Sequence, residues 1–193
     1  MATDAGSSGM EAAKLVVDAL TPLAVLAVGY VLNNRLRRVE QAQWANQNVI
    51  TRRLSIFGDV APKLNRLLCF ATFVGSWKEV QPKQVVALKR ALDETMYSNR
   101  LLFSDELFAA YQRFMATMFA MFATVDADAP LRAPISHPGL GDRRNLAWWD
   151  RGLEACFSID NPASLEEIRY AYEDLSRHFR GDLHVIDAEA TQG

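Results

Sequence analysis

The chain has 193 residues, of which 50% are hydrophobic and 23% are charged, and its formal net charge is −2 at pH 7. This length is sufficient for one domain with a hydrophobic core in addition to a short membrane segment. Acidic residues outnumber basic ones from Asp93 onward, which excludes a general nucleic-acid-binding surface.

The N-terminal part contains one long apolar run, from Leu15 to Leu32. A helix of about 18 residues spans roughly 27 Å, close to the hydrocarbon thickness of a bilayer. Asp18 weakens the run at its start, because an ionised carboxylate is costly in lipid. We predict a single-pass transmembrane helix over 15–33 that follows a disordered segment, 1–14. A buried helix, or one lying at the membrane interface, remains the alternative.

Three arginines directly follow the apolar run, namely Arg35, Arg37 and Arg38. The positive-inside rule places this end of the helix in the cytoplasm and the N-terminus outside. We therefore expect a protein of the bacterial inner membrane with a cytoplasmic C-terminal domain. The bilayer is its first predicted partner, and the same three arginines are expected to contact anionic lipid headgroups. A cleaved signal peptide is disfavoured, because its positive charge would precede the apolar run.

The next segment, 34–57, has the pattern of a polar helical connector that ends where Gly58 interrupts it. Asp59 is predicted to cap a new helix that carries Pro62 in its first turn. The apolar residues of this helix recur with a period of about 3.6, which is typical of a buried helix face. They are Val60, Leu64, Leu67, Leu68, Phe70, Ala71, Phe73, Val74 and Trp77.

Two further helices are predicted in the middle of the chain. Pro82 is expected to begin the first of them, since proline is favoured at the start of a helix. Ser104 is the predicted N-cap of the second, with Asp105 and Glu106 in its first turn. The second helix has the strongest apolar period in the chain and is predicted to be the central core helix. Its apolar residues are Leu107, Phe108, Tyr111, Phe114, Met115, Met118, Phe119, Phe122 and Val125.

Residues 126–144 contain several prolines and glycines and no period, so they are predicted to form a long loop. Its tip, from His137 to Arg144, has a Gly-x-Gly-x-Arg sequence. That tip offers backbone amides and the side chains of Arg143 and Arg144 to an anion. The motif is weak, and a loop without a bound anion is the preferred interpretation.

The last part of the chain is again predicted to be helical. Asn145 should cap a short helix, and Ser164 with Glu167 forms the capping box of a longer one that ends near Gly181. A flexible tail, 182–193, follows. The fold class is therefore all-α, with residues 58–181 forming a cytosolic antiparallel bundle of about five or six helices and no strand or hairpin.

No catalytic, cofactor-binding or metal-binding residue is predicted. Asp174 and His178 are four residues apart, with His184 nearby, but a surface pair explains them better than a closed metal site. Cys69 and Cys156 are interpreted as buried, reduced thiols. The known nucleotide-binding, nucleophile and metalloprotease motifs are missing from the sequence, which favours a protein that is not an enzyme.

Two blocks of sequence suggest a relationship. They are RRLSIFGDVAPKLNRLLCFATFVGSWKE, from Arg52 to Glu79, and LLFSDELFAAYQRFM, from Leu101 to Met115. These blocks resemble uncharacterised bacterial proteins that have an N-terminal membrane segment and a cytosolic helical domain. The resemblance implies no activity, and it implies the same order of anchor, connector and helical domain.

The sequence thus predicts an accessory or scaffold protein that binds another protein or its own copies. One alternative is a membrane-disrupting effector, a toxin or defence protein triggered through its cytosolic domain, because Asp18 and Gly29 can promote helix association in lipid. A second is a soluble helical binding domain whose first helix is buried. A third is an enzyme that uses the loop at 130–142.

Overall fold

The computed structural model describes residue 33 and residues 47–120 and 128–183. The chain divides into two compact units, Met1–Val49 and Ile50–Gly193. The predicted N-terminal segment, the anchor at 15–33 except for Asn33, and the three arginines after it lie outside the described residues. No helix in the described part of the chain has the length and apolar character that crossing a bilayer requires.

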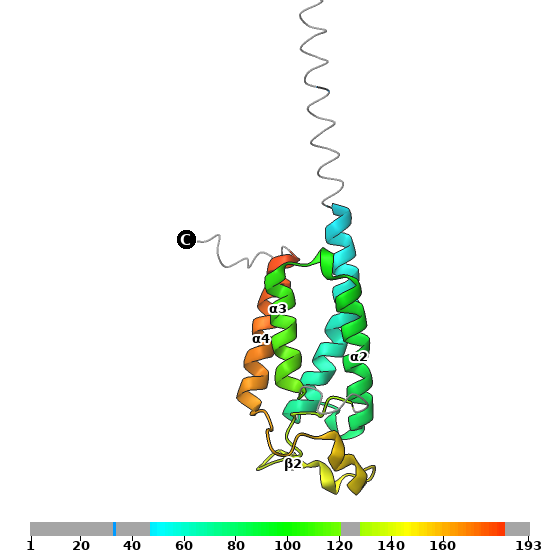
Figure 1. Ribbon diagram of the computed structural model, residues 1–193, viewed down its shortest axis with the longest axis vertical. Coiled ribbons are helices and arrows are strands. Elements are labelled where there is room, and N and C mark those ends of the chain that lie inside the picture. The colour runs from blue at the N-terminus through cyan, green and yellow to red at the C-terminus, as the bar shows by residue number, and fades with distance from the viewer. Residues whose placement is uncertain (1–32, 34–46, 121–127, 184–193) are drawn as a thin grey trace, which may run out of the picture. The chain divides into compact units, whose positions relative to one another are not determined.

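The second unit is a bundle of α-helices that run in alternating directions (Figure 1). The first of these, residues 50–72, is called the first bundle helix below. The others are α2 (Pro82–Ser98), α3 (Asp105–Met118) and α4 (Leu165–Asp182). Short 3-10 segments join them, namely η1 (Trp77–Glu79), η2 (Arg100–Leu102), η3 (Arg143–Asn145) and η4 (Arg151–Cys156). The described residues are thus mainly helical, as predicted.

The predicted helix break at Gly58 is wrong, because residues 47–72 are helical without interruption. Pro62 cannot donate a hydrogen bond to the carbonyl of Gly58, which costs about 3 kcal/mol in a regular helix. Ile56, Val60 and Leu64 are buried on either side of this defect. Burying each such side chain contributes about 1.5–3 kcal/mol, so the packing outweighs the defect. Asp59 does not cap a helix and instead pairs with Lys63.

The first bundle helix ends five residues earlier than predicted, in a turn that needs a left-handed residue. Phe73 occupies this position with a φ of 60°, and the amide of Val74 donates to the carbonyl of Cys69 over 3.0 Å. This is the Schellman arrangement, with phenylalanine where glycine is usual. The turn leaves Val74 50% exposed, against the prediction, and directs Trp77 into the core.

One hydrophobic core joins the first bundle helix, α2, α3 and α4. It confirms most of the predicted apolar positions on each helix. Aromatic rings connect the helices at the end of the bundle where α4 finishes: the ring centroids of Phe57 and Phe179 are 5.1 Å apart, and those of Phe103 and Phe179 are 6.0 Å apart. Phe57 belongs to the stretch that the sequence assigned to the connector, yet it packs against this core.

The predicted long loop is more structured than expected. Strand β1 (Ser136–His137) pairs antiparallel with β2 (Gly141–Asp142), so the prediction of no hairpin is wrong. Leu131 is buried and forms isolated bridges with Phe119 and Phe157. Strands of two residues are too short for an alternating pattern to reveal them. The predicted helical positions Phe122 and Val125 lie outside the described residues.

The predicted helix ends are partly confirmed. Ser104 caps α3, and Ser164 with Glu167 forms the capping box of α4. Asn145 does not cap a helix; it ends η3, while Asp150 caps η4. Gly181 lies inside α4, whose last residue is Asp182.

Arg53 closes the end of the bundle at which the second unit begins. Its Nε donates to the carbonyl oxygen of Leu102 in η2, and its Nη1 donates to the carbonyl oxygen of Asp182 over 2.8 Å. The carboxylate of Asp182 in turn accepts the amide of Ser104 over 2.7 Å. One side chain thus links the start of the first bundle helix to the α2–α3 connection and to the end of α4.

Candidate binding pocket

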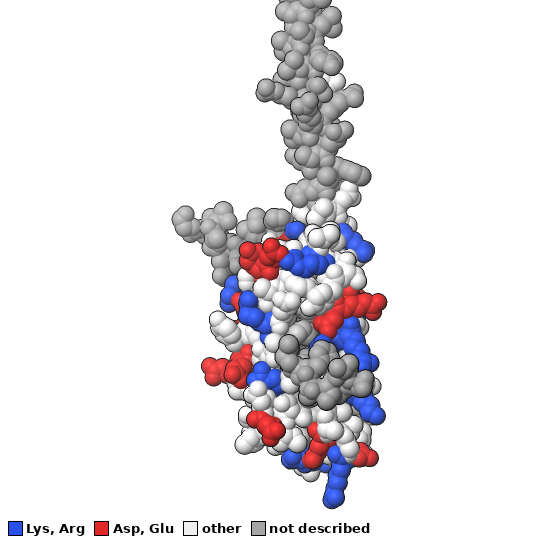
Figure 2. All heavy atoms as spheres, viewed as in Figure 1, with Lys and Arg blue, Asp and Glu red and all other residues white. Residues whose placement is uncertain are grey.

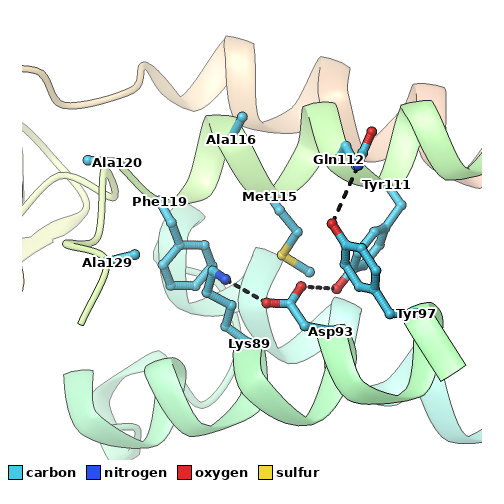
Figure 3. Close-up of a pocket in the computed structure, with 10 residues that line it drawn as sticks. All are labelled: Lys89, Asp93, Tyr97, Tyr111, Gln112, Met115, Ala116, Phe119, Ala120 and Ala129. Carbon is cyan, nitrogen blue, oxygen red and sulfur yellow. Dashed lines mark hydrogen bonds and ion pairs between the residues drawn. The ribbon is translucent and has the colours of Figure 1, made fainter. Parts of the chain in front are cut away.

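A pocket of about 460 Å³ lies between α2 and α3 (Figure 3). Its volume falls in the range of small-molecule sites, about 300–1,000 Å³. Residues spaced by four line it on both helices, because such residues share one helix face. They are Lys89, Asp93 and Tyr97 from α2, Tyr111 and Met115 from α3, and Phe119, which directly follows α3, with Gln112, Ala116, Ala120 and Ala129 at the edges.

Asp93 is the polar centre of the pocket. Its Oδ1 accepts the hydroxyl of Tyr111 and its Oδ2 accepts Nζ of Lys89, both over 2.6 Å. Lys89 Nζ also lies 5.6 Å from the centroid of the Phe119 ring. The carboxylate and the ammonium group form an ion pair, so the polar centre has no net charge.

Tyr111 is a fixed hydrogen-bond donor. Burial raises its pKa well above the ordinary value of 10, and the hydrogen bond to Asp93 and the charge of that carboxylate raise the pKa further. The hydroxyl therefore stays protonated at neutral pH. A catalytic base works best with a pKa near the working pH, so Tyr111 is better suited to donating a hydrogen bond than to accepting a proton.

Tyr97 stands at the mouth of the pocket and is 56% exposed. Its ring packs edge-on against Phe108, with the ring centroids 4.9 Å apart. Its hydroxyl oxygen accepts Nε2 of Gln112 over 3.4 Å. The mouth thus has a fixed aromatic wall that ends in a polar group.

This site cannot be recognised from the sequence of either helix alone, because its lining comes from faces of two different helices. Tyr111 and Met115 are predicted core residues, and Lys89 and Asp93 of the preceding helix are not among the predicted site residues. The spacing of Lys89, Asp93 and Tyr97 by four residues was a usable signal, since it places two charges and a ring in one row.

Replacing Tyr111 with phenylalanine is expected to lower the free energy of unfolding by about 1–2 kcal/mol at neutral pH, because a hydrogen bond to a carboxylate is lost. Folding raises the pKa of Tyr111, so its contribution is complete below pH 10 and is lost as the pH rises further. The free energy of unfolding is measured in urea at several pH values from neutral to above 10. It should decrease less with rising pH in Tyr111→Phe than in the wild type. Tyr170→Phe, at an exposed tyrosine, is the control. If the free energy of unfolding decreases equally above pH 10 in Tyr111→Phe and in the wild type, the raised pKa of Tyr111 is contradicted.

Arg143, one of the two arginines considered for the disfavoured anion site at the loop tip, is 0% exposed. Its guanidinium donates to the carbonyl oxygens of Pro134 and Phe70. Burial lowers its pKa to about 9, with a smaller opposing effect of Asp142, so it remains charged at neutral pH. Arg144 is engaged by Glu154, with 3.1 Å between Nε and Oε1. The two arginines are thus used within the fold.

Other polar residues that were considered as sites have partners within the fold. Asp174 accepts Arg113 over 2.6 Å and Arg177 over 3.2 Å, and His178 Nε2 lies 3.6 Å from its Oδ1. These basic neighbours lower the pKa of Asp174, with the Arg113 hydrogen bond as the main cause. His184 lies outside the described residues.

The two cysteines differ from their predicted burial. Cys69 and Cys156 are both free thiols, as predicted, but both are partly exposed. Burial is still sufficient to raise the pKa of Cys156, so this thiol is poorly suited to act as a nucleophile.

Comparison of the chain with models of protein families, with characterised proteins and with solved structures found no match.

Proposed function

We propose that this protein is a single-pass, membrane-anchored accessory or scaffold protein of the inner membrane, whose cytoplasmic bundle binds another protein or its own copies. The apolar run from Leu15 to Leu32 and the arginines that follow it support the anchor and its N-out orientation. Anionic lipid headgroups beside Arg35, Arg37 and Arg38 are part of this proposal.

The buried and partly buried polar groups of the bundle bond to one another or to the backbone, which supports the proposal that the protein is not an enzyme. Asp93 joins α2 to Tyr111 of α3, and Asp174 joins α4 to Arg113 of α3. Arg143, the most deeply buried charge in the described part of the chain, is bound to backbone carbonyls. A reacting centre needs polar groups that converge on a substrate position, whereas these groups converge on one another.

Leu101 gives the proposal a defined place for protein contact. It lies in η2 and is 98% exposed, one turn after the exposed ring of Tyr97. On the face shown in Figure 2, basic and acidic side chains are interspersed, which supports a protein partner over a nucleic acid.

The anchor is tested by cell fractionation followed by carbonate extraction of the full chain. We expect it to stay in the membrane pellet and to be released when residues 15–32 are replaced by a polar helical sequence. Recovery of the wild-type chain in the soluble fraction would contradict the anchor. Retention of the replaced variant would assign membrane binding to other residues.

The contact at Leu101 is tested with a photo-crosslinking amino acid at this position in cells. We expect one discrete crosslinked product, whose mass distinguishes a second copy from a different protein. The same amino acid at Glu166, an exposed position on α4, is the matched control. Equal crosslinking at the two positions, or none at either, counts against a specific contact.

A further inference from the structure

We propose that the pocket between α2 and α3 binds a small, uncharged, largely apolar molecule that carries a hydroxyl group. This ligand site goes beyond the proposed function, because it depends on the bundle alone and not on the anchor or on a protein partner. The proposal uses the shape of the pocket, the charge at its centre and the hydrogen-bonding groups around it.

The apolar part of the pocket sets the character of the ligand. The rings of Tyr111 and Phe119 and the side chain of Met115 form its inner wall, and the small side chains of Ala116 and Ala120 lie at its edge (Figure 3). Met115 and Phe119 are buried in the core and cannot turn away. An aromatic or aliphatic group that enters the pocket removes its apolar surface from water and contacts apolar side chains on several sides, which is favourable.

The charge at the centre excludes ionised ligands. Lys89 and Asp93 neutralise each other across 2.6 Å, and both side chains are mostly buried. A carboxylate ligand would be attracted by Lys89 and repelled by Asp93, and a cationic ligand would meet the reverse. Neither would recover the free energy lost when its charge leaves water. A neutral ligand avoids this loss.

A hydroxyl group matches the remaining hydrogen-bonding capacity. Asp93 accepts one bond on each oxygen, and a carboxylate has about four acceptor positions, so it can accept a third bond from a ligand hydroxyl. Tyr97 accepts Gln112 through its oxygen and can donate its own hydrogen to the ligand oxygen. Asp93 and Tyr97 are four residues apart on α2 and both line the pocket, so the ligand hydroxyl is assigned a position between them.

The test uses the full chain labelled with ¹³C at the methionine methyl groups, in buffer or lipid nanodiscs as fractionation dictates. Three probes of similar size are compared: 4-phenylphenol, biphenyl and biphenyl-4-carboxylate. We expect a saturable shift of the Met115 methyl signal, with 4-phenylphenol binding about tenfold more tightly than biphenyl and the carboxylate most weakly. Met96 and Met118, which are buried in the core away from the pocket lining, are internal references.

Variants separate pocket binding from other effects. Ala116→Trp should fill the space and abolish the Met115 shift, whereas Ala147→Trp, at an exposed position near the hairpin, should not. Any binding that remains in Ala116→Trp measures partition of the probe into lipid. Asp93→Asn removes the negative charge of Asp93 from the pocket, so biphenyl-4-carboxylate should gain affinity and overtake 4-phenylphenol. Tyr97→Phe should reduce the advantage of the phenol over biphenyl, with Tyr170→Phe as its control.

Three results would overturn the proposal. They are equal binding of the phenol and biphenyl, tighter binding of the carboxylate to the wild type, and a Met115 shift that survives Ala116→Trp. If Asp93→Asn does not fold, Tyr97→Phe decides, because this exposed substitution preserves the packing. These results are independent of the carbonate extraction, so the ligand site and the anchor can fail separately.

Discussion

Replacing Arg143 with methionine is expected to lower the free energy of unfolding by about 3–5 kcal/mol. Methionine restores the apolar length of the side chain, but it leaves the carbonyl oxygens of Pro134 and Phe70 buried without a donor. Removing a buried charge is favourable only when its polar partners are removed as well, and backbone carbonyls remain. The loss should appear as a lower urea midpoint in tryptophan fluorescence.

The position of Arg143 explains the size of this effect. The carbonyl of Phe70 is among the last of the first bundle helix, where carbonyl groups have no helical partner and the helix dipole is negative. The guanidinium also lies 4.3, 4.0 and 5.5 Å from the ring centroids of Phe70, Phe73 and Trp77. It thus caps a helix and fills an aromatic cluster at once.

Two matched variants make the Arg143 prediction specific. Arg143→Lys should recover only part of the loss, because an ammonium group lacks the planar fork that stacks on rings and bonds to two carbonyls. Arg144→Met removes a neighbouring, largely exposed ion pair with Glu154 and should cost less than about 1 kcal/mol. Similar losses in Arg143→Met and Arg144→Met would show that Arg143 has no special role.

Replacing Gly141 with alanine is expected to cost about 2–4 kcal/mol. Its φ is 147°, a conformation that side chains other than glycine rarely adopt. A Cβ atom there would lie 2.9 Å from Cη2 and 3.0 Å from Cζ2 of Trp77. Trp77 is 5% exposed and packs edge-on against Phe73 with a centroid distance of 5.0 Å, so it has little room to move.

Gly139→Ala is the control for Gly141→Ala. Gly139 has a φ of 81°, but no atom lies within 4 Å of the position of its added Cβ. It should therefore show only the conformational cost of a positive φ, roughly 1–2 kcal/mol. The difference between the two variants, measured by urea unfolding, isolates the contact with Trp77, and equal costs would mean that this contact relaxes freely.

The predictable part of the fold depends on interactions within one helix. Pro82, Ser104 and Ser164 mark helix starts because each acts within its own first turn. The apolar period of α3 likewise identifies the residues that it buries. Signals of this kind are complete in a short window of sequence, so the helices and their core faces could be predicted.

The features that were missed depend on residues far apart in the chain. Arg143 bonds to Phe70, 73 residues away, and nothing near either residue indicates the other. Gly58 resembles a helix end until the burial of its neighbours is known. The pocket requires Asp93 of α2 to meet Tyr111 of α3. In each case the deciding energy comes from packing between elements, which a local pattern does not contain.

The bridge from Arg53 to Asp182 brings together the start of the first bundle helix and the end of α4. Residue 50 and residue 183 therefore emerge side by side, and the hairpin with Trp77 occupies the opposite end of the bundle (Figure 1). A circular permutant that joins these ends with a short linker and opens the chain in the hairpin turn should retain the four helices. A reporter inserted next to residue 50 or residue 183 marks the same end of the bundle, and an insertion in the hairpin marks the opposite end.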